Sequence, residues 1–373
     1  MNFSDLKTTN CTEKESSISQ KELNFGSLIN SSISFDAKED YSNRDKFLSF
    51  INSKNPAFFE NFDLLEYINS GSTGCVYSGI FKGKNKKSVA IKFFISKKHK
   101  YKYNEKINNN IHEINLSRKL HHKNVTEMFG YYQSPEINYS ILEYGKYGDI
   151  EFFLRNLLKK HFFSETILNY FSFQILESLQ YIHKCKIAHM DIKPGNILIN
   201  SNLEAKITDF SISCSYAKFQ QNDIVKFPCV GTGRFMSPEI LSKETIAIKD
   251  CDKIDLYSFG VTLYYLFYAD FPYKLREIQC KDYKEFSKNI KNEELIFPEK
   301  RKISNLFKDF LVSILEKNLT KRININQALN HPWIQATKII YDEKENTSCQ
   351  ESFMIRLITD NIPKFNDFVN LKT

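Results

Sequence analysis

The chain has 373 residues, enough for one large domain or two ordinary ones, and 42% of its residues are hydrophobic. Its formal net charge is +8, but the lysines are scattered among Asn and Glu, so nucleic-acid binding is not expected. The longest apolar segment, residues 259–269, is too short to span a bilayer, so no membrane association is expected.

The eight cysteines are dispersed along the chain, with no Cys-x-x-Cys pair and no histidine at metal-ligand spacing. This pattern predicts reduced thiols and no structural zinc. The first residues, Met1 to Asp5, show no basic start followed by an apolar run, so no secretory signal is expected. Together these features predict a protein inside the cell, in the cytoplasm, the nucleus or both.

Residues 1–61 are rich in Ser, Asn, Lys and Glu, with isolated apolar residues in no sustained period. Such a segment buries too little apolar surface to offset its ordering entropy, so we expect a mostly disordered extension. Within it, residues 45–51 can form a helical turn or two that would dock on the folded part of the chain. Continuous order is expected to begin near Phe62.

A strand is predicted at Leu64–Ile68, and it leads into a loop with glycines at positions 71 and 74. These glycines permit close backbone approach, so peptide N–H groups in residues 69–79 can cover a triphosphate. Taken alone, two glycines are also common in purely structural turns.

The alternating run Val89–Lys92 predicts a second strand, which ends in a lysine. After a lysine- and asparagine-rich insert at residues 97–110, the spacing of Ile and Leu predicts a helix over residues 111–120 that carries Glu113. Considered singly, this lysine and this glutamate could both be ordinary surface charges.

Another strand is predicted at residues 139–142, followed by the polar segment 143–149. The pattern from Ile150 to Lys184 is helical and strongly apolar. Its core-facing stripe is predicted to contain Phe171, Ile175, Leu179 and Ile182. We interpret His183, within this run, as structural and not catalytic.

Residues 189–198 place a carboxylate, an ammonium group and a carboxamide within six positions of one another. A Pro-Gly bend between them lets a short loop turn all three toward one point. Asp191 can accept a proton from a hydroxyl, Lys193 can neutralise a phosphate, and the Asn196 carbonyl can bind a hard cation. A short strand, 197–199, leads away.

Several motifs together resemble the protein kinase family. They are the glycine loop, Val-Ala-Ile-Lys at 89–92, His-Met-Asp-Ile-Lys-Pro-Gly-Asn at 189–196, Asp-Phe-Ser at 209–211, Gly-Thr-Gly-Arg-Phe-Met-Ser-Pro-Glu at 231–239 and Asp-Leu-Tyr-Ser-Phe-Gly at 255–260. The resemblance covers about 62–334 and implies an α+β bilobal fold. It predicts a kinase domain at 62–335, with a small β-rich lobe at 62–143 and a helical lobe at 146–335.

The resemblance implies ATP and Mg²⁺ as cofactors and assigns roles by position. Asp191 would take the proton of the substrate hydroxyl, Lys193 would stabilise the γ-phosphate, Lys92 would hold the other phosphates, and Glu113 would hold Lys92. Asn196 and Asp209 would bind the metal. Nucleotide binding is assigned to Asn69, Ser70, Gly71, Ser72, Thr73, Gly74, Cys75, Val76, Ala90, Lys92, Glu143, Gly145 and Leu198.

The resemblance also implies contacts that hold the site together. Thr232 would hydrogen-bond near Asp191 and Lys193, Glu239 would form a buried pair with Arg322, and Asp255 would brace the catalytic-loop backbone. The sequence Asp-x-Lys-Pro-x-Asn is similar to serine/threonine kinases more than to tyrosine kinases. The function implied is transfer of the γ-phosphate of Mg-ATP to Ser or Thr hydroxyls of a protein substrate.

Three positions depart from the family pattern: Asn69 replaces a glycine, Met190 an arginine, and Ser211 a glycine. A pseudokinase scaffold is therefore one alternative, and phosphorylation of a small molecule or lipid is another. Because the thioether of Met190 cannot bind phosphate, we hypothesise that activation needs no phosphorylation at Ser211, Ser213, Ser215 or Tyr216.

The tail, residues 336–373, is apolar enough to pack on a surface. Autoinhibition, binding of a regulatory partner and simple extension of the fold all remain open for it.

Overall fold

The computed structural model describes residues 44–70, 74–94, 111–134, 137–157, 163–273 and 280–336. The chain divides into two compact units. Among the described residues, the small unit contains those from 44 to 114 and from 128 to 144, and the large unit contains 115–127 and those from 145 to 336. No helix in the described ranges combines the length and apolarity needed to cross a membrane.

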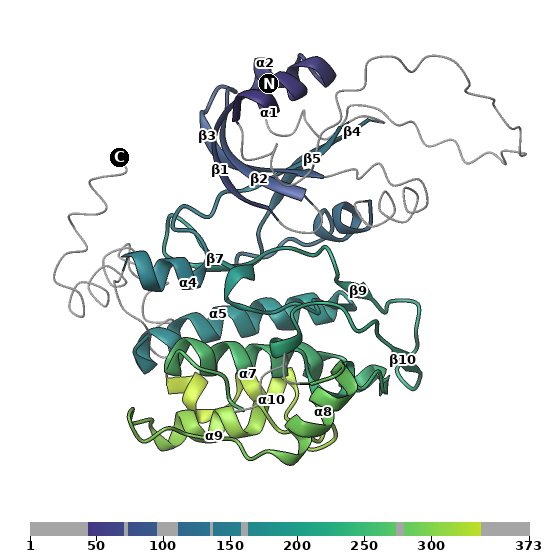
Figure 1. The fold of residues 1–373 in the computed structure, drawn as a ribbon, viewed down its shortest axis with the longest axis vertical. Helices are drawn as coiled ribbons and strands as arrows, with labels where there is room; N and C mark the ends of the chain where they lie inside the picture. The colour runs from purple at the N-terminus through teal and green to yellow at the C-terminus, as the bar shows by residue number, and fades with distance from the viewer. Residues whose placement is uncertain are drawn as a thin grey trace, which may run out of the picture. The chain divides into compact units, whose positions relative to one another are not determined.

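The small unit is built on a five-stranded antiparallel sheet (Figure 1). Its strands, in spatial order, are β1 (Phe62–Ser70), β2 (Gly74–Phe81), β3 (Lys87–Phe94), β5 (Asn138–Glu143) and β4 (Met128–Gln133). These runs are rich in β-branched and aromatic residues, which suit a pleated, half-buried surface. The strands predicted at 64–68, 89–92 and 139–142 are confirmed.

The two faces of this sheet bury different residues, as the alternation of side chains along a strand requires. In β3, Ile91 and Phe93 belong to one hydrophobic cluster, while Phe94 belongs to another. The second cluster also contains Ile114, from a helical stretch at residues 111–117. Glu113 lies in the same stretch, so this helix brings its carboxylate to the Lys92 face.

Continuous order begins earlier than the predicted start near Phe62, and the helical turns expected at residues 45–51 are present and packed on the folded part. Helices α1 (Arg44–Lys54) and α2 (Phe58–Asn61) precede the sheet. Three of their apolar side chains, Phe47, Ile51 and Phe58, are fully buried in the cluster that contains Ile91 and Phe93. Tertiary packing therefore supplies the burial that the local composition could not reveal. Residues 1–43 and the tail from 337 lie outside the described residues.

The large unit is mainly helical (Figure 1). Its helices are α4 (Ile150–Phe152), which continues as the π-helical turn η2 (Phe153–Leu157), α5 (Glu165–Lys184), α6 (Pro238–Leu241), α7 (Asp252–Tyr268), α8 (Tyr283–Asn292), α9 (Asn305–Ile314) and α10 (Ile325–Leu329). Side-chain caps fix several starts: Ser164 accepts from Ile167 N at α5, and Ser304 accepts from Phe307 N at α9. The predicted small sheet unit and larger helical unit are confirmed.

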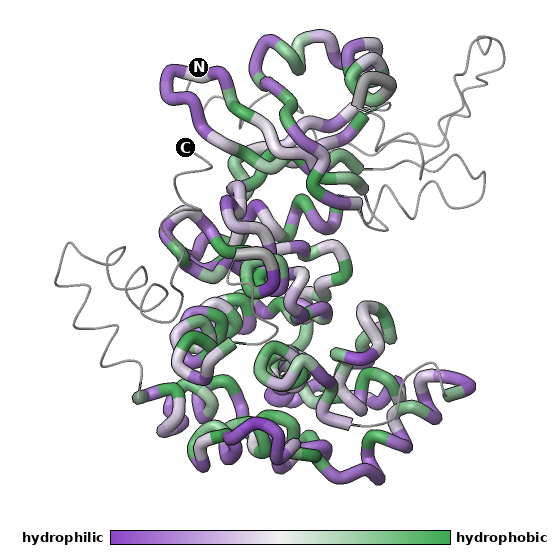
Figure 2. The backbone as a smooth tube through the Cα atoms, turned by 60° about the vertical axis from the view of Figure 1, so that its left-hand side comes forward, coloured by the Kyte–Doolittle hydropathy of each residue, from purple (hydrophilic) through white to green (hydrophobic). Residues whose placement is uncertain are grey.

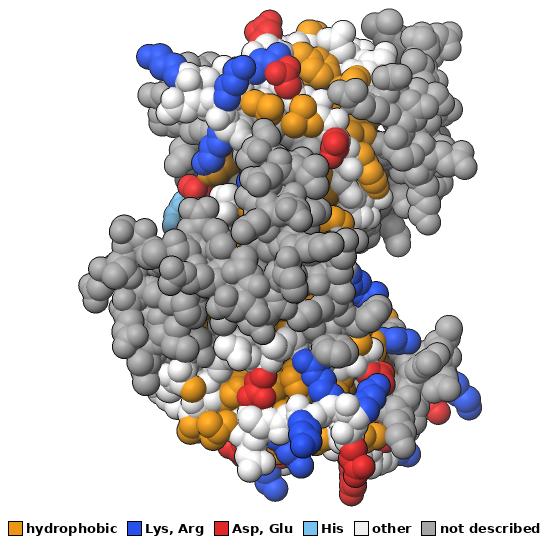
Figure 3. Space-filling model, turned by 90° about the vertical axis from the view of Figure 1, so that its left-hand side faces the viewer, with side chains coloured by type: hydrophobic (Ala, Val, Ile, Leu, Met, Phe, Trp, Pro, Cys, Tyr) orange, Lys and Arg blue, Asp and Glu red, His pale blue; other side chains and the backbone are white. Residues whose placement is uncertain are grey.

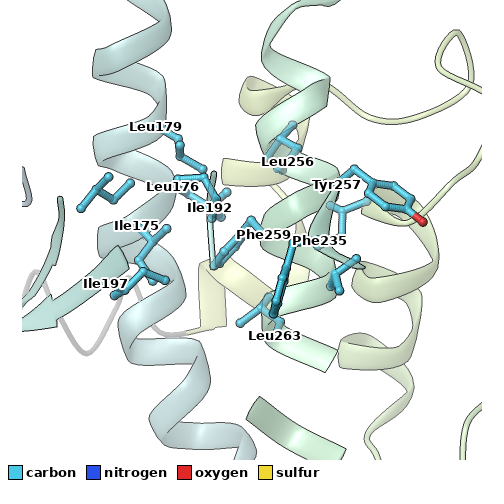
Figure 4. Close-up of a cluster of buried hydrophobic side chains, with 14 of the residues drawn as sticks. Ile175, Leu176, Leu179, Ile192, Ile197, Phe235, Leu256, Tyr257, Phe259 and Leu263 are labelled. Atoms are coloured by element: carbon cyan, nitrogen blue, oxygen red, sulfur yellow. The ribbon is translucent and has the colours of Figure 1, made fainter. Parts of the chain in front are cut away.

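The core of the large unit forms where α5 faces α7. Figure 4 shows Ile175 and Leu179 of α5 directed toward Phe259 and Leu263 of α7, with Ile192 between them. Helix α7 is buried almost all round, which suits a central element. The stripe predicted on α5 (Phe171, Ile175, Leu179 and Ile182) is entirely buried.

In the part of the large unit that the structure describes, three two-stranded sheets and three short 3₁₀ turns hold the connecting segments. The sheets pair β6 (Ile187–Ala188) with β9 (Cys214–Ser215), β7 (Ile197–Ile199) with β8 (Ala205–Ile207), and β10 (Ile224–Lys226) with β11 (Thr245–Ala247). The turns are η3 (Pro194–Asn196), η4 (Gly233–Phe235) and η5 (Ile248–Asp250). Two of these sheets flank residues 189–196 and fix both ends of that loop.

Hydrophobic and hydrophilic stretches alternate along the backbone in Figure 2, as expected when each element buries one face. On the face seen in Figure 3, the Lys and Arg side chains of the described residues are interspersed with acidic and uncharged ones. That distribution agrees with the scattered charge of the sequence.

Candidate active site

The backbone of the loop between β6 and η3 is anchored by a buried carboxylate on α7. Asp255, which is 0% exposed, accepts hydrogen bonds from His189 N (2.8 Å) and Met190 N (2.9 Å). Its Oδ2 also lies 2.8 Å from His183 Nε2. The predicted brace is confirmed, and His183 has the structural place expected of it.

Burial by itself would raise the pKa of the Asp255 carboxyl. The hydrogen bond and charge of His183, together with His189, outweigh burial and hold that pKa below its ordinary value. The carboxylate therefore stays ionised, as acceptance of three hydrogen bonds requires.

Replacing Asp255 with Asn is expected to loosen this loop, because an amide NH₂ would face a backbone N–H or the His183 ring. An unsatisfied buried donor costs about 1–3 kcal/mol. Native-state hydrogen exchange at the His189 and Met190 amides should then accelerate at least ~5-fold, since 1 kcal/mol is about that factor. Unchanged exchange at both amides would show that the carboxylate does not hold the loop.

The carboxylate of Asp191, which is 9% exposed, is the point where the polar groups of the loop converge. Its Oδ1 accepts from the backbone N (3.0 Å) and the hydroxyl (3.0 Å) of Thr232. Its Oδ2 accepts from Lys193 Nζ (2.6 Å) and Asn196 Nδ2 (2.9 Å). Lys193 also donates to the Thr232 hydroxyl (2.7 Å), so the predicted contacts of Thr232 are confirmed.

Asn196 and Asp209 are presented by adjoining loops of the large unit. The Asn196 side-chain nitrogen donates to the Asp191 carbonyl (2.8 Å), which leaves Oδ1 as the atom that can bind a cation. Its backbone carbonyl accepts from Thr208 N (3.0 Å), which ties the segment carrying Asp209 to the catalytic loop. Asp209 has a φ of 65°, an uncommon backbone geometry that is frequent at functional sites.

The donor set of Asn196 and Asp209 fits Mg²⁺, which is usually held by one or two carboxylates together with phosphate oxygens and water. Within the described ranges no group of three or more His, Cys, Asp or Glu side chains could hold a metal by itself. Phosphate oxygens or water would supply the remaining ligands of a cation bound here.

In the small unit, the predicted pair of Lys92 and Glu113 is confirmed. Lys92 Nζ lies 2.7 Å from Glu113 Oε1, and the side chains are 8% and 5% exposed. Val76 is the partner of Lys92 across the β2–β3 ladder, and Ala90 precedes Lys92 by two residues on the same face. These three predicted nucleotide-binding residues thus share one face of the sheet.

The flanks of the glycine loop are described, whereas Gly71, Ser72 and Thr73 lie outside the described residues. A Cβ on Gly74 would lie 2.1 Å from the Phe93 carbonyl oxygen, so only glycine fits there. Asn69 pairs with Val76 in the β1–β2 ladder. It is not among the residues with positive φ, so this position does not need the backbone freedom of the glycine that Asn69 replaces.

Ser70 and Cys75 close the β1–β2 ladder as partners. The side chain of Cys75 does not take the predicted place at the nucleotide. It is fully buried in the cluster on the opposite face of the sheet, and burial raises the pKa of its thiol to about 12. The alternation of a strand explains the error, because Val76 and Cys75 must point to opposite faces. Cys75 is a packing residue and not a reactive thiolate.

Glu143 ends β5 in the small unit. In the large unit, Gly145 and Leu198 meet: a Cβ on Gly145 would lie 3.0 Å from the Leu198 Cβ. Leu198 is half-buried on β7. The structure therefore brings these two predicted nucleotide-binding residues together.

The segment after Asp209 is held by hydroxyls of its own residues. Ser213 Oγ donates to the His189 carbonyl (3.0 Å), and Tyr216 Oη donates to the His183 carbonyl (3.2 Å). Both side chains are buried. Met190 is also buried, at 4% exposure and a φ of 71°, within the large-unit core. The segment thus rests on hydrogen bonds and apolar packing.

The buried Glu239–Arg322 pair is confirmed as well. Arg322 Nη1 lies 2.6 Å from Glu239 Oε1, and Nη2 lies 3.1 Å from Oε2. Sequence reasoning missed Thr262, whose hydroxyl donates to the Ile192 carbonyl (3.4 Å) from within α7. Its only signal was an aliphatic hydroxyl within the mainly apolar run at residues 259–269.

Comparison with known proteins decides the family. Residues 62–334 match the family model described as protein kinase domain. The chain belongs to the protein kinase family. Residues 44–61 of this kinase, which carry α1 and α2, lie outside the matched range.

Among curated proteins, the kinase is 28% identical over 237 residues to an Aurora kinase of Schizosaccharomyces pombe, covering 63% of this chain and 61% of the relative. It is 29% identical over 222 residues to serine/threonine-protein kinase Aurora-2 of Arabidopsis thaliana, covering 60% and 72%. It is 31% identical over 293 residues to the probable serine/threonine-protein kinase fhkC of Dictyostelium discoideum, covering 76% and 47%. The match therefore spans less than two thirds of two of these three relatives.

Proposed function

We propose that this kinase transfers the γ-phosphate of Mg-ATP to Ser or Thr hydroxyls of protein substrates. The observation that carries the proposal is the Asp191 carboxylate, fixed by four hydrogen bonds from Thr232, Lys193 and Asn196. Phosphoryl transfer asks a protein mainly to position groups and stabilise spreading charge, and a carboxylate fixed in this way suits that task.

In this proposal Asp191 orients the substrate hydroxyl and accepts its proton. Lys193, which already lies 2.6 Å from Asp191, adds positive charge beside the transferring phosphoryl group. Thr232 bridges the two, because it contacts both Asp191 and Lys193. The three side chains would move little between the free and the reacting state, which limits the cost of reorganisation.

Nucleotide binding is proposed for the Lys92 face of the small sheet and for the Gly145–Leu198 contact of the large unit. Lys92, held by Glu113, would bind phosphate oxygens, and the residues around Gly74 would offer peptide N–H groups. Val76, Ala90 and Leu198 supply apolar surface for the base, and Glu143 and Gly145 would offer backbone groups.

Magnesium is proposed to bind Asn196 and Asp209. When bound, the ion would neutralise charge on the phosphates and hold their geometry. Asn196 is fixed for this role by its hydrogen bonds to Asp191, so the proton acceptor and the cation ligand keep a constant separation.

A survey of acceptors tests the proposal against its alternatives. Labelled ATP and magnesium are supplied with mixed Ser, Thr and Tyr peptides in one reaction, and with lipids or small molecules in others. Label on Ser or Thr peptides supports the proposal. Label only on a lipid or small molecule overturns the substrate class, and ATP binding without transfer to any acceptor favours the pseudokinase alternative.

Activity is expected to survive treatment with a protein phosphatase. Met190 cannot bind a phosphate, and the segment after Asp209 is held by hydrogen bonds from its own Ser213 and Tyr216 hydroxyls. Of the four candidate sites, Ser213 and Tyr216 are buried, so Ser211 and Ser215 are the accessible ones. Specific activity before and after treatment is the measurement. A large loss that substitution of one of these residues reproduces would refute the expectation.

We also propose a location inside the cell. Four described cysteines, Cys75, Cys185, Cys214 and Cys251, are free thiols, as a reducing compartment favours. A protein substrate is the proposed partner, and a regulatory partner for residues 336–373 remains a proposal.

A further inference from the structure

Helices α1 and α2, here called the cap helices (residues 44–61), form an integral part of the small unit's core. Phe47, Ile51 and Phe58 are 1%, 0% and 1% exposed. In Figure 1 the cap helices lie beside the sheet of the small unit. Because these three side chains are withdrawn from water into the cluster of the sheet, the cap helices belong to the folded unit.

Phe47 sits directly behind the strand positions proposed to bind nucleotide. Its ring stacks on Tyr77 (centroids 4.8 Å, planes 11° apart) and meets Phe93 edge-on (5.0 Å, 89°). Tyr77 follows Val76 in β2, and Phe93 follows Lys92 in β3, while Val76 and Lys92 are ladder partners. Successive side chains along a strand point to opposite faces of the sheet. The Phe47 ring, which contacts Tyr77 and Phe93, therefore lies on the face opposite the side chains of Val76 and Lys92.

Phe58 and Asn55 extend this contact across the sheet. The Phe58 ring lies 5.7 Å from Phe93 and 5.3 Å from Tyr139 of β5, measured between centroids. Asn55 Nδ2 donates to the Tyr139 hydroxyl (3.2 Å). Burial is the main cause that raises the pKa of Tyr139, so this phenol stays a neutral hydrogen-bonding group. The cap helices thus hold β2, β3 and β5 together.

On its other face, β3 is held through the Lys92–Glu113 ion pair and the packing of Phe94 against Ile114. The strand that carries Lys92 is therefore clamped between two helical elements. Close-packed interiors transmit small displacements, and a binding group must keep its place to within about 0.5 Å.

We propose that the cap helices position Lys92 for nucleotide binding, with Phe47 as the principal positioning residue. The inference rests on the proposed role of Lys92. Loss of the Phe47 ring would leave a cavity behind the β2–β3 pair and let the Lys92 ammonium leave its place. A purely stabilising role would lower the amount of folded protein and not the affinity of each folded molecule for nucleotide.

A double-mutant cycle on nucleotide binding separates these roles. The dissociation constant for Mg-ATP is measured by equilibrium titration of the full chain, with Lys92 or Lys92→Ala, each with Phe47 or Phe47→Ala. In the Lys92 background Phe47→Ala should weaken binding about tenfold, and in the Lys92→Ala background by less than about twofold, a coupling within the usual range for residues that act together. Equal factors in both backgrounds, or no weakening in either, would overturn the proposal.

Two further variants complete the test. Ser49→Ala, at an exposed position of α1, should leave the dissociation constant unchanged. If Phe47→Ala does not fold, Phe47→Leu takes its place, because it keeps an apolar side chain but removes the stacked ring. Its coupling to Lys92 should be smaller but of the same sign, and no coupling would overturn the proposal. The readout needs no phosphate transfer, so it is independent of whether the kinase proves active.

Discussion

Replacing Asp191 with Asn should lower kcat for phosphate transfer by about 10²–10⁴-fold, the usual contribution of a positioned general base. Asn has nearly the same volume but cannot take a proton from a hydroxyl. Four donors from Thr232, Lys193 and Asn196 also converge on the carboxylate, two on each oxygen, and an NH₂ group would oppose two of them. Initial rates at saturating Mg-ATP and peptide measure the loss.

Binding of Mg-ATP by Asp191→Asn should change by less than about threefold, because the proposed phosphate and metal ligands remain in place. Asp309→Asn is the matched control: this side chain is 70% exposed and contacts His331 on the surface of the large unit. The control should keep full activity. Retention of full kcat by Asp191→Asn would remove Asp191 from the mechanism.

Breaking the Glu239–Arg322 pair should have the largest effect on stability. The side chains are 3% and 0% exposed, and the two terminal guanidinium nitrogens, Nη1 and Nη2, donate hydrogen bonds to the carboxylate. Arg322 also donates to the Glu316 carbonyl (2.7 Å) and the Lys253 carbonyl (3.0 Å). Removing one partner of such a pair leaves a buried charge uncompensated, which costs about 3–5 kcal/mol. Glu239→Gln should lower the free energy of unfolding of the large unit by that amount.

A nearby surface pair supplies the control. Glu244 pairs with Lys291 at 2.6 Å, but these side chains are 48% and 37% exposed. Glu244→Gln should therefore cost less than about 1 kcal/mol. Urea unfolding followed by a probe in the large unit measures both variants. Equal effects of the two substitutions would contradict the assigned importance of burial.

The sequence predicted the local elements around the site because short motifs there have strong constraints. The Pro-Gly bend after Lys193 and the apolar run after Asn196 appear as η3 and β7. The long-range pairs are a different matter. Lys92 and Glu113 are 21 residues apart, and Glu239 and Arg322 are 83 apart. No periodicity links such positions, so only the family resemblance could pair them.

Two features escaped prediction for physical reasons. The first is the full extent of α1 beyond the expected turns at 45–51: its buried residues are diluted by Ser, Asn and Lys, and tertiary contacts that no local pattern records stabilise it. The second is Cys75, which the family resemblance assigned to nucleotide binding by its position in the glycine-loop motif, whereas its side chain is a packing residue. The described part of that motif is strand β2, whose alternation turns this side chain away.

Transfer of labelled phosphate by the purified wild-type chain tests the proposed serine/threonine kinase activity most directly. The chain is incubated with labelled ATP, magnesium and a mixed Ser, Thr and Tyr peptide library, beside Asp191→Asn. Label is expected on Ser or Thr with the wild-type chain and is expected to disappear with the variant. ATP binding by both proteins with no transfer by either would contradict the proposed activity and indicate a scaffold.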